Sequence, residues 1–367
     1  MSAALPEYVT LSVDGYVLMG WQEVEVERSA QHGAIAFTLK ATNPSFSAPA
    51  KALRRGKAVE IRTSPDEGAA RRGGGDLLCA GAIDTYHAVI GEGGNKDVTL
   101  SGRSKGRDAI DCPPIKHKTG RFENKTLLEI AKELDEFGIG FTTDQQLDKI
   151  PMVQRHPLET MFATVEREAR RAGLLLAAQP DGKIALTRAN TKRHAGALVE
   201  TQSPVRSWDI NIAPHMKRSP VVVRGQKRLG TGKDNLRQEY QDKGDAEVGH
   251  RPHLVIPEGD YSFKDLQKRA KWERLRAAGH GISVGVCVSR WRDDNGELWD
   301  PGRLMPIQVP SEDINQDLTL SSAKFVQKIG KDVGTTANLT FVDPKALGGK
   351  AGQGSSDAAF DPGAGIE

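Results

Sequence analysis

The first hundred residues alternate between apolar and polar side chains in short runs, a pattern typical of half-buried β-strands. Val24 and Val26, for example, alternate with three glutamates. The other runs of this kind are residues 9–13, 16–19, 35–39, 59–61, 77–83 and 98–100. Asp14-Gly15 predicts a hairpin turn, and residues 66–76 (DEGAARRGGGD) predict a flexible, exposed loop. Such a set of strands must close into a barrel or pack as a sandwich to hide its edges, so we expect a first β domain over residues 1–105.

The pattern then changes to helical spacing. Thr126-Leu-Leu-Glu129 predicts a capping box at the start of a helix that stops at Gly138. A second helix is predicted to open at Pro157 and to end at Gly173. Residues 174–179 and 183–187 then predict a hairpin around Pro180-Asp181-Gly182. We therefore expect a small α+β domain over residues 106–205.

Strand character returns from about Ser207, and Val221–Val223 is a fully apolar triplet in a stretch that ends at Gly225. Residues 226–251 predict a long polar loop, and Ser262 with Asp265 predicts the start of a helix over 263–278. Four further strands are predicted at residues 282–288, 304–309, 323–328 and 337–342. These elements define a second β domain over residues 206–342. Residues 343–367 are rich in Gly, Ala, Ser, Asp and Pro, which predicts a flexible tail or a segment that orders on a partner.

Composition narrows the function classes. The chain has 367 residues, with 51 Lys plus Arg against 48 Asp plus Glu, so its formal net charge is only +3. A surface built to bind nucleic acid needs a stronger basic excess. No run approaches the 18 apolar residues that would suggest a membrane span. Cys79, Cys112 and Cys287 lie far apart, which predicts free thiols rather than a disulfide framework or a zinc site.

A search for catalytic, cofactor-binding and metal-binding motifs predicts none. Gly225–Thr231 has the glycine spacing of a phosphate-binding loop but lacks the lysine that should follow the second glycine. His250 and His253 flank a proline and have no third ligand nearby. Two acid–base pairings, Asp84 with His87 and Asp108 with Asp111, are more simply interpreted as surface ion pairs or turn caps.

Two basic clusters leave a choice between a solvated helix face and contact with nucleic acid or an acidic partner. They are Lys264, Lys268, Arg269, Lys271, Arg274 and Arg276 in the late helix, and Arg167, Arg170 and Arg171 at the end of the second helix. Asp265 and Glu273 interrupt the first cluster, which favours the solvated helix face.

Several blocks of sequence, in the same order along the chain, resemble the baseplate hub proteins of contractile-tailed, Mu-like phages, which are related to the late control D family. The blocks are Ala80–Asp84, Val98–Cys112, Lys125–Ala131, and Trp291–Trp299 with the following Pro301-Gly302. In the family the second block lies at the first domain junction, the third in the first helix, and the fourth in a turn between two late strands. The Gly-rich residues 66–76 depart from the family pattern, which leaves the loop geometry there open.

The resemblance implies a mainly β protein with an α+β insertion, in which two tail-tube-like β-barrel domains assemble as a homotrimeric ring. Such a ring connects the tail tube or a distal tube protein to the central spike protein, contacts baseplate wedge proteins, and continues the channel through which DNA passes. The chain would then be a structural virion protein of the tail baseplate, assembled in the host cytoplasm and acting in host entry and genome ejection. It would have no enzymatic activity, no cofactor and no membrane insertion.

Two alternatives share this fold. The first is a hub with glycosidase-like activity against the cell wall, which needs a pair of carboxylates in a cleft. Glu129, Glu133 and Asp135 are predicted on ordinary helix faces, which argues against it. The second is a component of a contractile secretion or injection system. Those proteins usually continue into a long β-helical spike, and because the sequence ends at Glu367 we favour a hub whose spike is a separate polypeptide.

Overall fold

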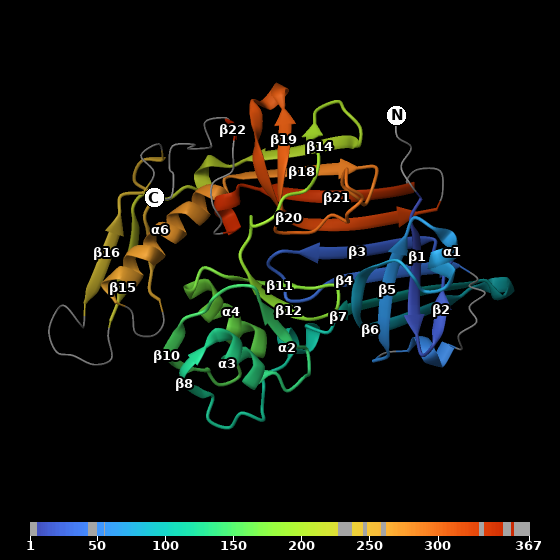
Figure 1. The fold of residues 1–367 in the computed structure, drawn as a ribbon, viewed down its shortest axis with the longest axis horizontal. Helices are drawn as coiled ribbons and strands as arrows, with labels where there is room; N and C mark the ends of the chain where they lie inside the picture. Colours follow the sequence, from blue (N-terminus) through green and yellow to red (C-terminus); the bar gives the residue numbers. More distant parts are fainter. Residues whose placement is uncertain are drawn as a thin grey trace.

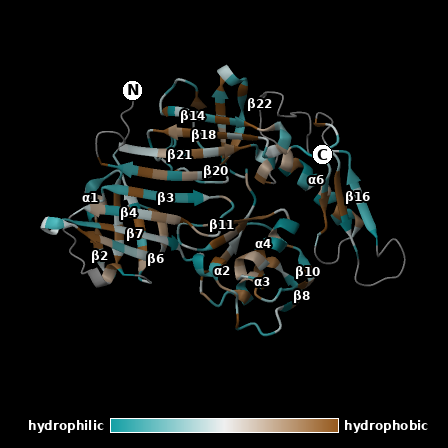
Figure 2. Cartoon of the chain, turned by 180° about the vertical axis from the view of Figure 1, so that it is seen from behind, coloured by the Kyte–Doolittle hydropathy of each residue, from teal (hydrophilic) through white to brown (hydrophobic). Residues whose placement is uncertain are grey.

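The structure is a computed structural model, and it shows a mainly β protein with few helices (Figure 1). It describes residues 6–42, 50–54, 56–226, 237–244, 248–257, 262–329, 334–347 and 354–355. Fourteen strands form one large sheet, which contains most of the predicted strands from both ends of the chain. Figure 2 shows apolar and polar residues alternating along these strands, as a sheet with one face on the core requires.

The N-terminal half of the sheet consists of seven strands. They are β1 (Tyr8–Val13), β2 (Tyr16–Leu18), β3 (Glu23–Ser29), β4 (Ala36–Thr42), β5 (Ala58–Ser64), β6 (Asp76–Ile90) and β7 (Lys96–Ser104). Asp14 and Gly15 form the predicted turn, both with positive φ. Close packing inside this half requires glycine at position 102. A Cβ on Gly102 would lie 2.2 Å from the carbonyl oxygen of Ala82 and 2.5 Å from the Phe37 ring.

The C-terminal half supplies the remaining strands of the sheet. They are β13 (Leu198–Val199), β14 (Val205–Ile212), β18 (Ile282–Val288), β19 (Leu304–Val309), β20 (Ile314–Lys328), β21 (Gly334–Val342) and β22 (Gly354–Ser355). The four late strands predicted from sequence are all present, and β20 begins nine residues earlier than predicted. Both halves contribute to one apolar core, which includes Leu39, Leu100, Phe325 and Phe341.

The two halves are joined edge to edge. β3 pairs antiparallel with the second part of β20, from Ser29 opposite Ser322 to Glu23 opposite Lys328. The strand order is therefore β14-β18-β21-β20-β3-β4-β7-β6-β5-β1-β2. The two tail-tube-like β-barrel domains that we expect are joined in one continuous sheet, and no closed barrel is formed among the described residues. Alternation along a strand predicts which face is buried but not which strand lies beside it.

The two halves repeat the same pairing pattern. β5-β6-β7-β4-β3 in the N-terminal half corresponds to β19-β20-β21-β18-β14 in the C-terminal half, and every pairing in both series is antiparallel. In each series the longest strand has 15 residues and pairs with a nine-residue strand. Each long strand also has a bulge where it pairs with its nine-residue neighbour, after Ile83 in β6 and after Leu320 in β20, and β6 has a further register shift at Leu78 opposite β5. The sheet thus contains a structural repeat.

The insert, residues 107–188, lies below the sheet in Figure 1. Its elements are α2 (Arg107–Asp111), β8 (Arg121–Thr126), α3 (Leu127–Leu134), β9 (Phe141–Thr143), β10 (Lys149–Gln154), α4 (Met161–Arg171), β11 (Leu175–Ala178) and β12 (Ile184–Thr187). The Thr126–Glu129 capping box is confirmed, as is the hairpin of β11 and β12. The insert has a core of its own, formed by residues such as Phe122, Ile130 and Val165.

Two predicted helix boundaries in the insert are wrong. α3 ends at Leu134 instead of running to Gly138, because the Asp135 carboxylate accepts the N–H groups of Ile139 and Gly140 and turns the chain. α4 begins at Met161 instead of Pro157. Thr160 caps it by accepting the Ala163 N–H, and Leu158 has φ of 65°, which no helix start allows.

A smaller unit projects beside the C-terminal half. It contains β15 (Val221–Gly225), β16 (Gln238–Asp242), β17 (His253–Val255) and α6 (Phe263–Gly279), with Val221, Val223, Leu266 and Ala270 as its core. The Ser262–Asp265 capping box is confirmed. The prediction of one polar loop over 226–251 is wrong in part, because β16 pairs with β15 inside it. Residues 227–236 and 245–247 of that loop lie outside the described residues.

Two segments predicted as flexible are ordered. Asp66 caps a short helix, α1 (Glu67–Arg71), inside the Gly-rich stretch 66–76. The start of the predicted tail is a buried 3-10 turn, η6 (Pro344–Leu347). A Cβ on Gly279 would lie 2.3 Å from the Ala346 nitrogen, so only glycine lets α6 approach this turn. Residues 348–353 and 356–367 lie outside the described residues. The other 3-10 turns are η1 (Ala50–Leu53), η2 (Glu92–Gly94), η3 (Pro214–Met216) and η5 (Pro310–Glu312).

Candidate functional site

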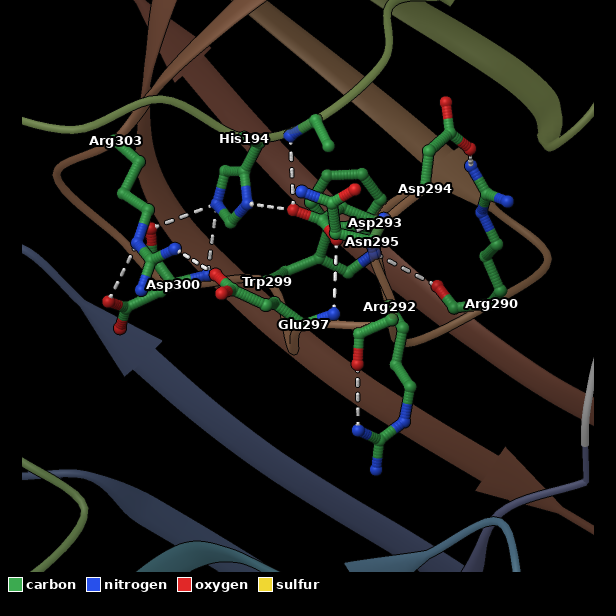
Figure 3. A network of polar contacts seen from close by, with 12 residues as sticks. His194, Arg290, Arg292, Asp293, Asp294, Asn295, Glu297, Trp299, Asp300 and Arg303 are labelled. Carbon is green, nitrogen blue, oxygen red and sulfur yellow. Dashed lines mark hydrogen bonds and ion pairs between the residues drawn. The ribbon is translucent and has the colours of Figure 1, made fainter.

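The chain between β18 and β19 forms a polar turn, residues 290–303, that holds several parts of the molecule together (Figure 3). Two tryptophans anchor it. Trp291 is buried against Phe325 and donates to the carbonyl oxygen of Thr336 at 2.7 Å. Trp299 is buried as well and donates to the carbonyl oxygen of Arg290 at 3.0 Å. This is the Trp-rich block that sequence resemblance places in a turn between late strands.

Asp293 is the centre of the polar turn. Its Oδ1 accepts the N–H groups of Asn295 (3.0 Å) and Glu297 (3.1 Å). Its Oδ2 accepts the N–H of Ala195 (3.1 Å) and lies 3.1 Å from His194 Nδ1. Burial acts to raise the pKa of Asp293, but these donors outweigh it and hold the pKa below its ordinary value. The carboxylate therefore stays ionised although it is buried.

His194 is on the connector, residues 189–204, which leads from the insert back to the sheet. The ring lies edge-on to Trp299, with centroids 5.0 Å apart. With its proton on Nδ1, the ring donates to Asp293 and accepts the Asp300 N–H at Nε2 (3.2 Å). A histidine fixed by two partners and buried in this way positions the connector and is not open to a substrate.

Arg292 extends the network across the two halves of the sheet. It donates to the buried Glu7 carboxylate (2.6 Å) and to Asp76 (2.6 Å), both of the N-terminal half. Glu7 also accepts the hydroxyl of Thr63 at 2.6 Å. Burial acts to lower the pKa of Arg292, but the two carboxylates raise it overall. The polar turn thus joins the connector, the C-terminal half and the N-terminal half.

The carboxylates considered as acid–base pairs are held in ion pairs. Asp84 accepts from Arg103 (2.9 Å) and Arg107 (2.7 Å), whereas His87 is exposed further along β6. Asp111 pairs with the same Arg103, which lowers its pKa. These contacts fit the interpretation as ion pairs and link α2 to the sheet.

The three carboxylates weighed for a glycosidase also have structural partners. Glu129 completes the α3 capping box. Glu133 pairs with Lys125 and with His117 (3.2 Å), and the lysine is the main cause of its lowered pKa. Asp135 accepts the backbone donors that end α3. These three residues therefore do not provide the pair of carboxylates, one on each side of a glycosidic bond, that a glycosidase needs.

Where the structure describes them, the remaining candidates give no catalytic or metal geometry. In the described part of the chain no group of three or more His, Cys, Asp or Glu could hold a metal ion. His250 is exposed and His253 is on β17. Most of the Gly225–Thr231 segment lies outside the described residues. Burial raises the pKa of the Cys79 thiol to about 12, so it is unreactive. None of the described helices is long and apolar enough to cross a membrane.

Several arginines of the basic clusters pair with neighbouring acids. Arg269 pairs with Glu273 (2.6 Å) and Arg274 with Asp242 (3.2 Å). In α4, Arg167 pairs with Glu159 (2.9 Å) and Arg170 with Glu166 (2.6 Å). Arg269 and Arg276 both lie over the Trp272 ring. This arrangement favours the interpretation as solvated helix faces.

Apart from the short terminal strands β2, β13 and β22, two longer stretches of the sheet have an open edge among the described residues, and both are suited to pairing with another chain. β14 is the last strand of the sheet on the C-terminal side. β5 pairs with β6 only as far as Ala82, so residues 85–90 of β6 have a partner on the β7 side alone. The side chain of Ile90, in this stretch, is 71% exposed. Free edges with apolar side chains are sites of strand pairing between chains.

Sequence reasoning missed His194, Glu7 and Arg292, because their contacts join residues far apart in the chain. It also missed Arg28. In β3 the buried face carries Val24, Val26 and Arg28, so the period of two would have marked an arginine at an apolar position.

Two stretches of the chain match models of known protein families. Residues 107–188 match the family model described as baseplate hub protein gp44-like, second domain. Residues 262–349 match that of the Mu phage baseplate assembly protein GpP, fourth domain. Over these two stretches the chain is therefore similar to phage baseplate hub proteins. The two family models support the predicted resemblance to the hub proteins of Mu-like phages.

Individual relatives agree. The chain is 28% identical over 315 residues to baseplate hub protein gp44 of Escherichia phage Mu, which covers 82% of this chain and 79% of gp44. The 43 kDa tail protein of prophage MuSo2 from Shewanella oneidensis has a similar fold, with a TM-score of 0.78, 24% identity, and coverage of 93% of this chain and 99% of that one. A type VI secretion system component of E. coli shares the fold more distantly, with a TM-score of 0.55, 9% identity, and coverage of 90% and 76%.

Proposed function

We propose that this chain is a structural, non-enzymatic hub of a contractile phage tail baseplate, and that three copies form a ring between the tail tube and the central spike. The ring continues the channel for DNA, and its neighbours are a tube or distal tube protein, the spike and baseplate wedge proteins. The protein is assembled in the host cytoplasm and acts in the virion during host entry and genome ejection. The two halves of each copy serve as two tube-like domains around the axis.

The observation that carries the proposal is the repeat within the sheet together with its open edges. β3, at the edge of the N-terminal half, is covered by the second part of β20 in the C-terminal half. In the structural repeat, β14 is the equivalent of β3, and the second part of β6 is the equivalent of the second part of β20. The same pairing between copies would place β14 of one copy on β6 of the next. A contact of this head-to-tail kind closes into a ring when its rotation returns to the start.

The repeat also predicts the register of this contact. Val26 lies opposite Phe325 in the contact within the chain. The equivalent residues between copies are Ile210 opposite Ala88. Trp208 would then lie opposite Ile90, and Ile212 opposite Tyr86. All of these apolar side chains are partly or largely exposed in the single copy, so the pairing would remove apolar surface from water.

Light scattering tests the assembly. A mass near three times the 39.8 kDa of one chain is expected for the purified protein. A Trp208→Lys, Ile90→Lys double variant should reduce the mass to that of one chain, because each edge would then carry a charge. A native protein that stays a single chain at high concentration would contradict a ring formed by this chain alone.

Cross-linking tests the register. Ile210→Cys with Ala88→Cys should give disulfide-linked dimers and trimers on a non-reducing gel, because directly opposed strand residues lie within disulfide range. Ile210→Cys with Val89→Cys is the matched control, since Val89 points to the other face of β6. Equal cross-linking of both pairs would contradict the predicted register.

A further inference from the structure

Arg28 is a charged residue in an apolar row. It follows Val24 and Val26 on the buried face of β3, and only 6% of it is exposed. The structural repeat gives a direct comparison, because Val24, Val26 and Arg28 correspond to Trp208, Ile210 and Ile212 of β14. The position that holds isoleucine in one half therefore holds arginine in the other. Burying a guanidinium costs free energy unless an anion compensates it, so a plain packing role does not account for this residue.

The protein compensates the Arg28 charge only weakly. Its ion-pair partner is Asp300, at 3.6 Å between Nη2 and Oδ1, which is beyond hydrogen-bond distance. Asp300 is shared, because its Oδ2 accepts from Arg303 at 3.2 Å. Burial lowers the pKa of the Arg28 guanidinium, Asp300 acts against this, and the charge of Arg303 adds to the lowering. Arg303 has a second carboxylate partner in Glu297, whereas Asp300, which is half-exposed, is the one ion-pair partner that the described residues give Arg28.

Arg28 lines a cavity of about 350 Å³ between the sheet and the insert. At roughly 30 Å³ per water, this volume holds a small molecule or a side chain rather than a single ion. Among its basic lining residues, Arg28 is buried and Arg303 is half-buried, whereas Arg188 and Lys192 are exposed. Four cations line the cavity against two carboxylates, those of Asp144 and Asp300. The threonines 142, 143, 187 and 191 add hydroxyl groups to the lining.

We infer that this cavity binds an oxyanion, with Arg28 and Arg303 holding a carboxylate or phosphate group and Arg188 and Lys192 holding the rest of the ligand. The planar guanidinium fork matches such groups, and an anion there would supply the charge that Asp300 only partly provides. The group can come from a free polyvalent anion or from acidic side chains of another polypeptide. In either case binding would couple the insert to the sheet, because residues of β3, β11, β12, the connector and the polar turn all line the cavity.

Isothermal titration in a low-salt Tris chloride buffer tests the site with three probes: inorganic phosphate, citrate, and the peptide acetyl-Glu-Glu-Glu-Glu-amide. At least one probe should bind with one site per chain and weaken as salt is added. Arg28→Met should raise Kd about tenfold or more, the lower range for loss of a charged hydrogen-bond partner. Citrate binding without peptide binding identifies a free anion as the source. A peptide that displaces citrate identifies acidic side chains.

Two double variants with the same change in net charge complete the test. Arg188→Gln with Lys192→Gln should raise Kd several-fold, whereas Lys116→Gln with Lys118→Gln, exposed in the insert away from the cavity, should leave it unchanged. If Arg28→Met does not fold, the first pair decides the matter. The inference is overturned if no probe binds the native protein at millimolar concentration, or if the cavity variants bind as tightly as the native protein.

Discussion

The two halves of the sheet have the same strand pairings, but equivalent edge strands are covered by a neighbouring strand in one half and open in the other. β3 of the N-terminal half is covered by β20, whereas the equivalent β14 ends the sheet. Likewise the second part of β20 has strands on both sides, and the equivalent residues 85–90 of β6 have a strand on one side. The structure therefore contains this strand contact once, between β3 and β20. At the equivalent places, β14 and residues 85–90 of β6, the strands that could make the same contact are open. This contrast is what favours an assembly built by repeating one kind of junction.

The covered and open stretches should differ most in their contribution to stability. Phe325→Ala removes a fully buried ring at the junction with β3, and we expect it to lower the free energy of unfolding by about 3–5 kcal/mol. Urea denaturation of the unassembled protein measures this. Ile90→Ala, on the open stretch of β6, should change it by less than about 0.5 kcal/mol. Similar losses for both variants would mean that the two stretches do not differ in the way described.

A change in the polar turn tests whether the halves unfold together. Asp293→Asn should lower the free energy of unfolding by about 1–3 kcal/mol at pH 7, because buried donors lose a charged acceptor. The pKa of Asp293 is lower in the folded protein than in the unfolded chain, so its contribution is present above about pH 4 and is lost as the pH falls through the folded pKa. The difference between native and variant should therefore shrink in acid.

The readout for this variant is a urea transition followed both by tryptophan fluorescence and by far-ultraviolet circular dichroism. Coincident transitions are expected, because Arg292 and the β3–β20 pairing join the halves. Two separate transitions, with only the first moved by Asp293→Asn, would show that the halves are independent.

The smallest effect on stability is expected at Arg28, the position where the equivalent strand of the other half has an isoleucine. Arg28→Ile copies the residue of the equivalent position, Ile212, into the N-terminal half. In low-salt Tris chloride without an added oxyanion, this change should be neutral or stabilising by about 1 kcal/mol, because it removes a weakly paired buried charge. Thermal unfolding without and with citrate measures it. A clear loss of stability without an added oxyanion would show that Asp300 alone satisfies the arginine.

The sequence predicted local structure well and distant pairing poorly. The alternation of Val24 and Val26 with glutamates and the two capping boxes, at Thr126 and Ser262, are signals contained in a few residues. The β3–β20 pairing depends on residues nearly 300 positions apart, and nothing in either strand specifies the other. The same separation hid the contacts of His194 and Glu7. In the segment 66–76, the glycines outweighed the capping signal of Asp66, so a helix was predicted as a loop.

The junction between β3 and β20 has a mechanical consequence. On its outer face, Lys324 pairs with Glu25 (2.9 Å) and Lys328 with Glu23 (2.6 Å), while Val26 and Phe325 face the core. A pull along the strand direction would load all the ladder hydrogen bonds and both ion pairs at once, whereas a pull across the strands would open them one after another. The joint is therefore strongest against sliding along its own length, and peeling is the direction in which it would fail first.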